Sequence, residues 1–227
     1  IDNDTDNMHC TWYGIKCDDK GRVLSLQLES NNLEGRIEIT KIAQLKALRS
    51  IDLSHNNIIF DFGIITSDDT MRIESMNLAF ITRIDNLHSI SYLNKTLGEL
   101  HLDDSRVLQT WNASSNLSGN GSNNFALPVG MYELSNLRRL SMDRTHIAGK
   151  LLNHEITTSE GIESWKKLIY LSMVGNQISG TIPSGLSKLK SLSILRLRLN
   201  NLHGEGLEQL VTELTQITVL DISRQIS

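Results

Sequence analysis

Aliphatic residues recur along this chain in a fixed arrangement, in which a leading apolar position is followed by others three and five residues later. The clearest copy runs from Leu192 through Leu195 and Leu197 to Asn200 and Leu202, with polar residues between. Such alternation over a short stretch predicts a β-strand with one buried face. The leading positions are Val23, Leu48, Ile73, Leu97, Leu137, Leu168, Leu192 and Ile217.

The leading positions are regularly spaced. Subtracting successive residue numbers gives intervals of 25, 25, 24, 40, 31, 24 and 25 residues. Five of the seven intervals fall within the roughly 20–29 residues of a leucine-rich repeat. A single repeat cannot bury its apolar edge, so neighbours are expected to stack around one core. A βαβ enzyme fold would instead need helices of about ten or more residues between its strands.

We therefore predict an α/β repeat fold, a leucine-rich-repeat solenoid. Short parallel strands should line its concave face, and irregular, 3-10 or helical segments its convex side. About eight repeats should occupy residues 23–227. Each repeat ends at a polar position, where an asparagine side chain can bond backbone groups of the turning chain. This position holds Asn31, Asn56, Ser105, Thr145, Asn176, Asn200 and Gln225, whereas repeat three has Ile81 there.

The chain has two cysteines, Cys10 and Cys17. A zinc site would need four ligands, and only His9 lies nearby. A redox pair would normally be Cys-x-x-Cys, so the spacing favours a structural disulfide and an oxidising compartment. The acidic run Asp2–Asn7 lacks the glycine and the glutamate that a calcium loop requires, so we expect no metal site.

The string Cys10–Cys17, followed by Gly21-Arg22-Val23, resembles the amino-terminal cap of plant-type leucine-rich-repeat receptors and receptor-like proteins. The segments Leu33–Ile37 and Ile178–Pro183 resemble that family's Leu-Ser-Gly-x-Ile-Pro signature. The likeness covers almost the whole chain, although only repeat six carries the proline. It implies that residues 1–22 form part of a disulfide-closed amino-terminal cap.

The family resemblance implies an extracellular, glycosylated, cell-surface scaffold that binds a peptide or protein ligand. A co-receptor is a further candidate partner, and no cofactor is expected. We expect the chain to be part of the ectodomain of a receptor kinase or receptor-like protein that signals across a membrane. The alternatives are a secreted inhibitor of a cell-wall hydrolase and an adhesion or matrix module.

The composition argues against further classes of protein. The net charge of −4 and the pI near 6.0 are not those of a general nucleic-acid-binding protein. No run of about 18 apolar residues occurs, so a membrane contact would come only through a segment absent from this chain. The chain starts at Ile1 rather than Met, and we expect it to be a fragment.

Catalytic motifs are not apparent, and we predict that the chain is not an enzyme. Its seven histidines are scattered, without a His-Glu-x-x-His motif or a glycine-rich phosphate loop. Ser187 and Lys190 form a bare Ser-x-x-Lys pair with no partner expected nearby.

The two long intervals predict loop insertions near residues 108–126 and 150–162. The first is rich in Gly, Ser and Asn, which is typical of a surface loop, although it could instead hide a degenerate repeat between Leu108 and Leu117. Sequons, which are acceptor motifs for N-glycosylation, lie at Asn3, Asn94, Asn112, Asn116 and Asn120.

Residues that alternate with the buried leucines should face the concave side, where a ligand would bind. The candidate ligand-binding residues, from repeats five to seven, are Arg139, Arg144, Tyr170, Val174, Arg196 and Arg198. Repeats one to four place acidic residues there, namely Glu29, Asp52, Glu74, Glu99, Asp103 and Asp104. We expect this face to change from acidic to basic, with an apolar step between.

Arg196 and Arg198 are two residues apart on one strand, so both side chains should point the same way. Such a pair can hold a carboxylate through charge-assisted bonds. It resembles the Arg-x-Arg pair with which some receptors of the family bind the free carboxyl end of a peptide hormone. The interpretation that we favour is a solvated basic patch that pairs with Asp221 of the next repeat.

Overall fold

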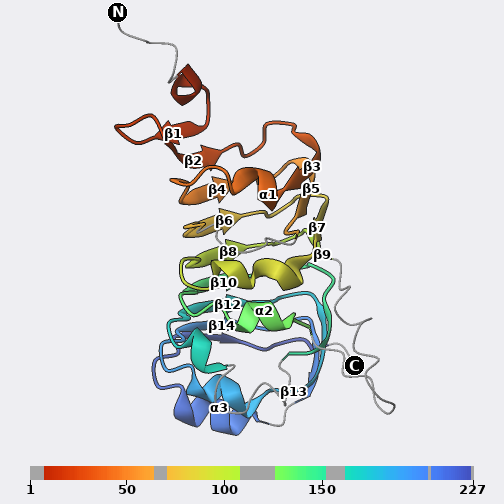
Figure 1. Cartoon of the computed structure of the whole chain (residues 1–227). Helices are drawn as coiled ribbons and strands as arrows, with labels where there is room; N and C mark the ends of the chain where they lie inside the picture. The colour runs from red at the N-terminus through yellow and green to blue at the C-terminus, as the bar shows by residue number, and fades with distance from the viewer. Residues whose placement is uncertain (1–7, 64–70, 108–125, 152–161, 204–205, 226–227) are drawn as a thin grey trace, which may run out of the picture.

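The structure, a computed structural model, describes residues 8–63, 71–107, 126–151, 162–203 and 206–225. Successive turns of the chain stack into an elongated solenoid, with the amino-terminal segment at the top of Figure 1 and the last repeats at the bottom. Each turn passes through a strand of one long sheet, a loop, a second strand and a return segment. The predicted leucine-rich-repeat solenoid is confirmed.

The long sheet has nine strands. β1 and β2 are antiparallel, and all later pairs are parallel. Residues at the same repeat position lie opposite one another, as Leu140 does with Leu171 and Leu171 with Leu195. The strands, in spatial order, are β1 (Ile15–Cys17), β2 (Val23–Gln27), β4 (Ser50–Asp52), β6 (Ser75–Asn77), β8 (Glu99–His101), β10 (Arg139–Ser141), β12 (Tyr170–Ser172), β14 (Ile194–Arg196) and β16 (Val219–Asp221).

The loops that follow the long sheet lead into two smaller parallel sheets, which the sequence pattern did not predict. Their strands contain few of the regularly spaced leucines, so the repeat pattern carries little sign of them. The first sheet contains β3 (Glu34–Glu38), β5 (Asn57–Asp61), β7 (Arg83–Asp85) and β9 (Arg106–Val107). The second contains β11 (Ala148–Lys150), β13 (Gln177–Thr181) and β15 (Asn201–His203).

A charged network joins three strands of the four-stranded sheet. Arg36 donates to Asp61 over 2.6 Å and to Asp85 over 2.8 Å, and Arg83 also donates to Asp85 over 2.8 Å. Asp61 accepts a further bond of 2.7 Å from the Asn86 amide. Burial alone would raise the pKa of Asp61. The hydrogen bonds from Asn86 and the Gly63 amide, together with the charge of Arg36, lower that pKa below its ordinary value.

The return segments hold short α and 3-10 helices, as expected for the convex side. They are α1 (Ile39–Ile42), η2 (Leu87–Leu93), α2 (Val129–Tyr132), η4 (Ile162–Trp165), η5 (Ser184–Lys188) and α3 (Leu207–Glu213), while η1 (Met8–Thr11) precedes the first strand. No helix in the described part of the chain is long and apolar enough to span a lipid bilayer.

One continuous core runs between the long sheet and the helices. The middle residue of each strand is at most 1% exposed at six successive repeats, Ile51, Met76, Leu100, Leu140, Leu171 and Leu195. Because each of these side chains packs on the equivalent one in the next repeat, the apolar edge of a single repeat is buried only by its neighbours.

In several repeats, the polar position at the end of the repeat bonds to the preceding repeat. The Asn176 amide donates to the carbonyls of Met142 and Met173 over 2.8 and 3.1 Å, and its oxygen accepts from the Thr145 amide over 3.0 Å. Gln225 repeats this role, since it accepts from Leu202 and donates back to Leu197.

Ser105 performs a smaller version of the same role. Its hydroxyl donates to the Leu78 carbonyl over 2.6 Å and accepts from the Ile81 amide over 3.1 Å. Repeat three, which has isoleucine at its own polar position, is therefore still connected to repeat four. The predicted bonding of these side chains to the turning backbone is correct, and it links neighbouring repeats.

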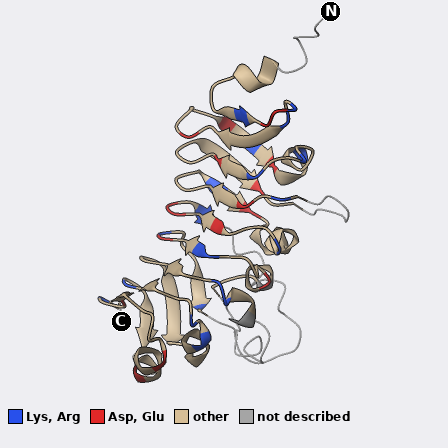
Figure 2. Cartoon of the chain, turned by 90° about the vertical axis from the view of Figure 1, so that its left-hand side faces the viewer, with Lys and Arg blue, Asp and Glu red and all other residues tan. Residues whose placement is uncertain are grey.

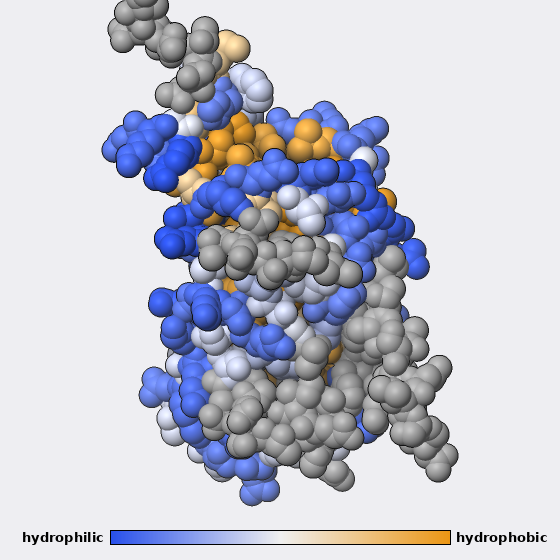
Figure 3. Space-filling view, in the orientation of Figure 1, coloured by the Kyte–Doolittle hydropathy of each residue, from blue (hydrophilic) through white to orange (hydrophobic). Residues whose placement is uncertain are grey.

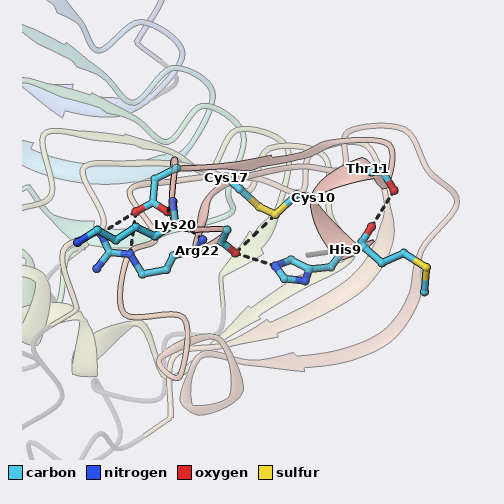
Figure 4. The surroundings of a disulfide bond; sticks show 9 residues. His9, Cys10, Thr11, Cys17, Lys20 and Arg22 are labelled. Carbon is cyan, nitrogen blue, oxygen red and sulfur yellow. Dashed lines mark hydrogen bonds and ion pairs between the residues drawn. A yellow bond between two sulfur atoms is a disulfide. The ribbon is translucent and has the colours of Figure 1, made fainter. Parts of the chain in front are cut away.

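The amino-terminal residues form a small unit at one end of the stack. Cys10 and Cys17 are joined by a disulfide, with their α-carbons 5.7 Å apart, as the spacing predicted. Figure 4 shows the His9 ring beside this bond, with Nε2 2.9 Å from the Gly21 carbonyl oxygen. Both sulfurs are taken up in the disulfide, so they are not available as thiolate ligands for a metal.

Gly14 allows this unit to approach the first repeat closely. Its φ of +78° is left-handed, and a β-carbon there would lie 2.2 Å from the Gln27 carbonyl oxygen. The Gln27 amide donates to the Gly14 carbonyl over 2.7 Å. Only glycine therefore permits the contact between β1 and β2 at this point.

Apolar surface is visible beside the amino-terminal unit, in the upper part of Figure 3. Val23, Leu26 and Leu28 of the first repeat are only partly buried, and Trp12 is 61% exposed. The amino-terminal unit thus covers the end of the core incompletely.

Candidate ligand-binding face

The exposed side of the nine-stranded sheet, called the sheet face below, carries most of the residues predicted to contact a ligand. Figure 2 looks onto its strands, and acidic and basic residues lie side by side along it. Equivalent positions of successive repeats form columns of side chains about 4.8 Å apart.

Tyr170 on β12 lies between two arginines of the sheet face. Arg139 on β10 is its partner across the parallel strands, with the guanidinium carbon 4.7 Å from the ring centre. The guanidinium carbon of Arg196 on β14 is 6.0 Å from the same ring. Among the described residues, neither arginine forms an ion pair. The ring therefore positions two cations that no described residue neutralises.

Arg198 does not act together with Arg196. Its Nε lies 3.6 Å from Oδ2 of Asp221 in the following repeat, whereas Arg196 lies toward Tyr170. This is the pairing with Asp221 that we favoured from the sequence. The two side chains therefore do not form a joint carboxylate clamp in this structure.

Arg144 is neutralised within the protein. It lies in the loop after β10, has a left-handed backbone with φ of 53°, and donates to both carboxylate oxygens of Asp104, over 2.7 and 2.5 Å. The hydrogen bonds that Arg144 donates to Asp104 raise the pKa of Arg144 above its ordinary value. This pair leaves Arg144 little capacity for a ligand.

Val174 does not provide the expected apolar surface. Its side chain is only 5% exposed, and its amide donates to Oδ1 of Asp143 over 2.8 Å. The side chain is short, and in its column it stands between the longer Asp143 and Arg198, so little of it reaches solvent. The expectation from the sequence that Val174 contributes apolar surface between the acidic and basic parts of the sheet face is therefore wrong.

Several acidic residues of the sheet face have internal partners. Oδ1 of Asp103 accepts from the Ser141 hydroxyl and from the Asp143 amide, both over 2.7 Å. Asp143, which the sequence reasoning missed, accepts in turn from the Ser172 hydroxyl over 2.6 Å. Burial raises the pKa of Asp103, against the effect of these bonds. The expected acidic surface is thus partly a chain of hydrogen bonds between repeats.

A shallow cavity of about 440 Å³ lies at the edge of the sheet face where β6 and β8 begin. It is lined in part by Glu74, Glu99, Lys95 and Arg138. Glu74 lies 3.6 Å from the Arg49 guanidinium. Lys95 and Arg138 were not among the predicted residues. Lys95 precedes the repeat pattern that begins at Leu97, whereas Arg138 occupies the same repeat position as Glu74 and could have been predicted.

Of the glycosylation candidates, only Asn94 lies within the described residues. It is half-buried at the end of η2, and its carbonyl accepts from the Ser135 hydroxyl over 3.1 Å. Asn3, Asn112, Asn116 and Asn120 lie outside the described residues, as do most of the predicted insertions near 108–126 and 150–162.

The comparisons with known proteins agree with this architecture. Residues 167–189 match the family model described as Leucine Rich Repeat. Receptor-like protein 6 of Arabidopsis thaliana is 25% identical over 229 residues, which cover 83% of this chain and 23% of that protein. Brassinosteroid LRR receptor kinase BRL3 of Oryza sativa subsp. japonica is 31% identical over 150 residues, or 65% of this chain and 11% of that protein.

Solved structures give the same result. The match to the PEPR1-AtPEP1 structure covers 99% of this chain and 28% of the matched chain, with a TM-score of 0.70 and 24% identity. The ectodomain of the Arabidopsis thaliana receptor kinase GASSHO1/SCHENGEN3, in complex with CASPARIAN STRIP INTEGRITY FACTOR 2, covers 98% and 27%, with a TM-score of 0.65 and 22% identity.

This chain is a leucine-rich-repeat solenoid similar to plant receptor ectodomains. The solenoid spans less than a quarter of the length of the two curated relatives, at 23% and 11%. Below 25% identity, the structural likeness shows the fold alone. Support for a role of the sheet face comes from the residues of this chain, above all Arg139, Tyr170 and Arg196.

Proposed function

We propose that this solenoid is part of a non-catalytic, cell-surface ectodomain that binds a peptide or protein ligand on its sheet face. The observation that carries the proposal is the placement of Arg139 and Arg196 on either side of Tyr170, with no ion pair to another described residue. Similar ectodomains, such as that of GASSHO1/SCHENGEN3, form complexes with other polypeptides, which supports a ligand of this kind.

The geometry favours an extended ligand that crosses the strands. β10 and β14 are separated by one strand, so Arg139 and Arg196 lie on strands about 10 Å apart. Two carboxylates of one peptide, or a carboxylate and a backbone carbonyl, can meet both guanidinium groups while an apolar side chain packs on Tyr170. Charged hydrogen bonds of this kind contribute about 1.5–3 kcal/mol each.

A selection from a synthetic peptide pool tests the proposal. Peptides retained by the chain are expected to be acidic or to carry a free carboxyl end, and Arg139→Ala and Arg196→Ala should each weaken their binding about tenfold or more. Arg106→Ala is the matched control, since Arg106 is exposed on β9 of the four-stranded sheet. Retained peptides that bind both sheet-face variants as tightly as the unchanged chain would contradict the proposal.

A further inference from the structure

A second cavity lies on the flank of the solenoid, between the long sheet and the four-stranded sheet. Its volume is about 510 Å³, and its wall includes the rings of His55 and Phe80. These residues occupy the same position in successive repeats, and their rings stack with centres 4.3 Å apart and planes 11° apart. Glu34 and Asp104 also line this space, called the flank pocket below.

Phe80 is an unusual residue for this place. Its backbone is left-handed, with φ of 56°, and its side chain is 46% exposed. Bulky side chains rarely adopt left-handed backbone, and a ring left this exposed gains only part of its possible burial. His55 has the same φ of 56°. The same position is left-handed in all eight repeats, from Ser30 to Arg224, so this backbone conformation belongs to the repeat. Core packing does not account for the Phe80 ring, because nearly half of the side chain is exposed.

The two carboxylates that line the flank pocket differ in whether they are already paired within the protein. Both carboxylate oxygens of Asp104 already accept from Arg144. Glu34 is exposed at the start of β3 and has no ion-pair partner within the described ranges. One wall is therefore aromatic, and another presents a carboxylate that is not neutralised.

The polar rim adds hydrogen-bond acceptors. Asn57 and Thr82 line the same space, and the Thr82 hydroxyl donates to Oδ1 of Asn57 over 2.7 Å. This bond fixes the Asn57 amide, while the Thr82 oxygen keeps a lone pair for a donor from a ligand. The stacked rings, the Glu34 carboxylate and the Thr82 hydroxyl oxygen together match a flat, positively charged donor group.

We propose that the flank pocket binds the guanidinium group of an arginine side chain presented by a partner protein. The planar group contacts the exposed edges of the stacked His55 and Phe80 rings and donates a pair of hydrogen bonds to Glu34. Arginine fits better than lysine because its fork of donors is rigid and planar. This site is separate from the sheet face and does not rest on the function proposed above.

The test is an NMR titration of the whole chain with N-acetyl-arginine amide. Backbone amides at residues 55–57 and 80–82 are expected to shift in a saturable manner. N-acetyl-citrulline amide has the same shape without the charge, and it should bind at least tenfold more weakly. Saturation is expected in the millimolar range, since a single side chain supplies the whole interaction.

Two variants should each weaken arginine binding at least fivefold. Glu34→Gln removes the charge from an exposed side chain, and Phe80→Asn removes the ring while supplying a residue that tolerates left-handed backbone. Glu29→Gln is the matched control, because it removes an exposed carboxylate from the same repeat outside the pocket. Equal binding of citrulline, an unchanged dissociation constant in Glu34→Gln, or no saturable shift up to about 50 mM would overturn the proposal.

Discussion

Asn176 shows at the scale of one residue how this chain turns a repeated sequence into a joined structure. Its side chain is 5% exposed and bonds to backbone groups of both its own repeat and the preceding one. Gln225 reaches the same kinds of groups with a longer side chain, and Ser105 reaches the Ile81 amide and the Leu78 and Asp103 carbonyls with a single hydroxyl. The position thus requires a buried hydrogen-bonding group more strictly than it requires asparagine.

Replacing Asn176 with alanine should lower the free energy of unfolding by about 2–4 kcal/mol, because it leaves buried amide and carbonyl groups of two repeats without partners. Chemical denaturation measures this change. Asn201→Ala is the control, since Asn201 is exposed on β15, and it should stay within about 0.5 kcal/mol of the unchanged chain. Equal effects of the two substitutions would contradict this account of the polar position.

The sequence predicted which side chains reach the sheet face but not how they are used there. Arg144 and Asp104 are 40 residues apart, which equals one of the repeat intervals, so their pairing was visible in principle. The near-complete burial of Val174 was not, because it depends on the lengths of side chains in neighbouring repeats. Alternation along one strand determines the side of the sheet, while partners come from the strands beside it.

Among the elements, the strands of the long sheet were predictable and the two smaller sheets were not. The long sheet has a regular leucine pattern because one of its faces is always buried. β3, in contrast, reads Glu-Gly-Arg-Ile-Glu and acquires its partner only when repeats stack. The Arg36 network could have been suspected, since Asp61 and Asp85 are 24 residues apart and lie in register.

The Arg36 network should make stability depend on pH. The pKa of Asp61 is lowered in the folded chain, so its contribution is complete above the unfolded pKa of about 3.9 and is lost as the pH falls through the lower folded pKa. Arg36→Gln should unfold more easily than the unchanged chain at pH 7. The difference should shrink as the pH falls through the folded pKa of Asp61, because the carboxylate then loses its charge in both proteins.

Denaturant unfolding across this pH range measures the effect of the network. Arg106→Gln, on β9 of the same sheet, removes an arginine that has no ion-pair partner among the described residues, and it should leave the pH dependence unchanged. A constant difference between Arg36→Gln and the unchanged chain at every pH would show that the charge of Asp61 is not involved.

Gly14 and Gly35 allow steric contact to be separated from backbone strain. Both have left-handed φ values, +78° and +101°, but a β-carbon at Gly35 would meet nothing within 4 Å. Gly35→Ala should therefore lower stability by about 1 kcal/mol through strain alone, and Gly14→Ala by roughly 1–3 kcal/mol more, because the amino-terminal unit must move away from Gln27. Hydrogen exchange should accelerate at the Gln27 amide in Gly14→Ala and not in Gly35→Ala.

At the scale of the whole molecule, the described residues cover the core only partly at the two ends of the stack. Val23 and Leu26 at one end, and Ile217 and Leu220 at the other, are only partly buried. No described residue pairs with the outer edge of β16. Stacking protects the middle repeats from both sides, whereas the end repeats are protected from one side only, so stability should decline toward the ends.

The isolated chain is therefore expected to self-associate or to fray at β16. Hydrogen exchange should be fastest at Val219–Asp221 and slowest in Arg139–Ser141 of β10, which has neighbours on both sides. Size-exclusion chromatography over a range of concentrations detects association. A monomer whose β16 amides exchange as slowly as those of β10, with a single cooperative thermal transition, would contradict this expectation.

The joints made by Asn176, Asn200 and Gln225 involve backbone groups of the preceding repeat, and every repeat offers the same groups at the same places. Because these bonds are made to backbone groups, they do not depend on which repeat comes before. Duplication or loss of a whole repeat by unequal recombination would therefore leave the scaffold foldable. Pairs such as His55 with Phe80, or Arg144 with Asp104, depend on particular neighbours and would be broken or newly created. Inheritance by whole repeats would preserve the solenoid while rapidly renewing what its surfaces recognise.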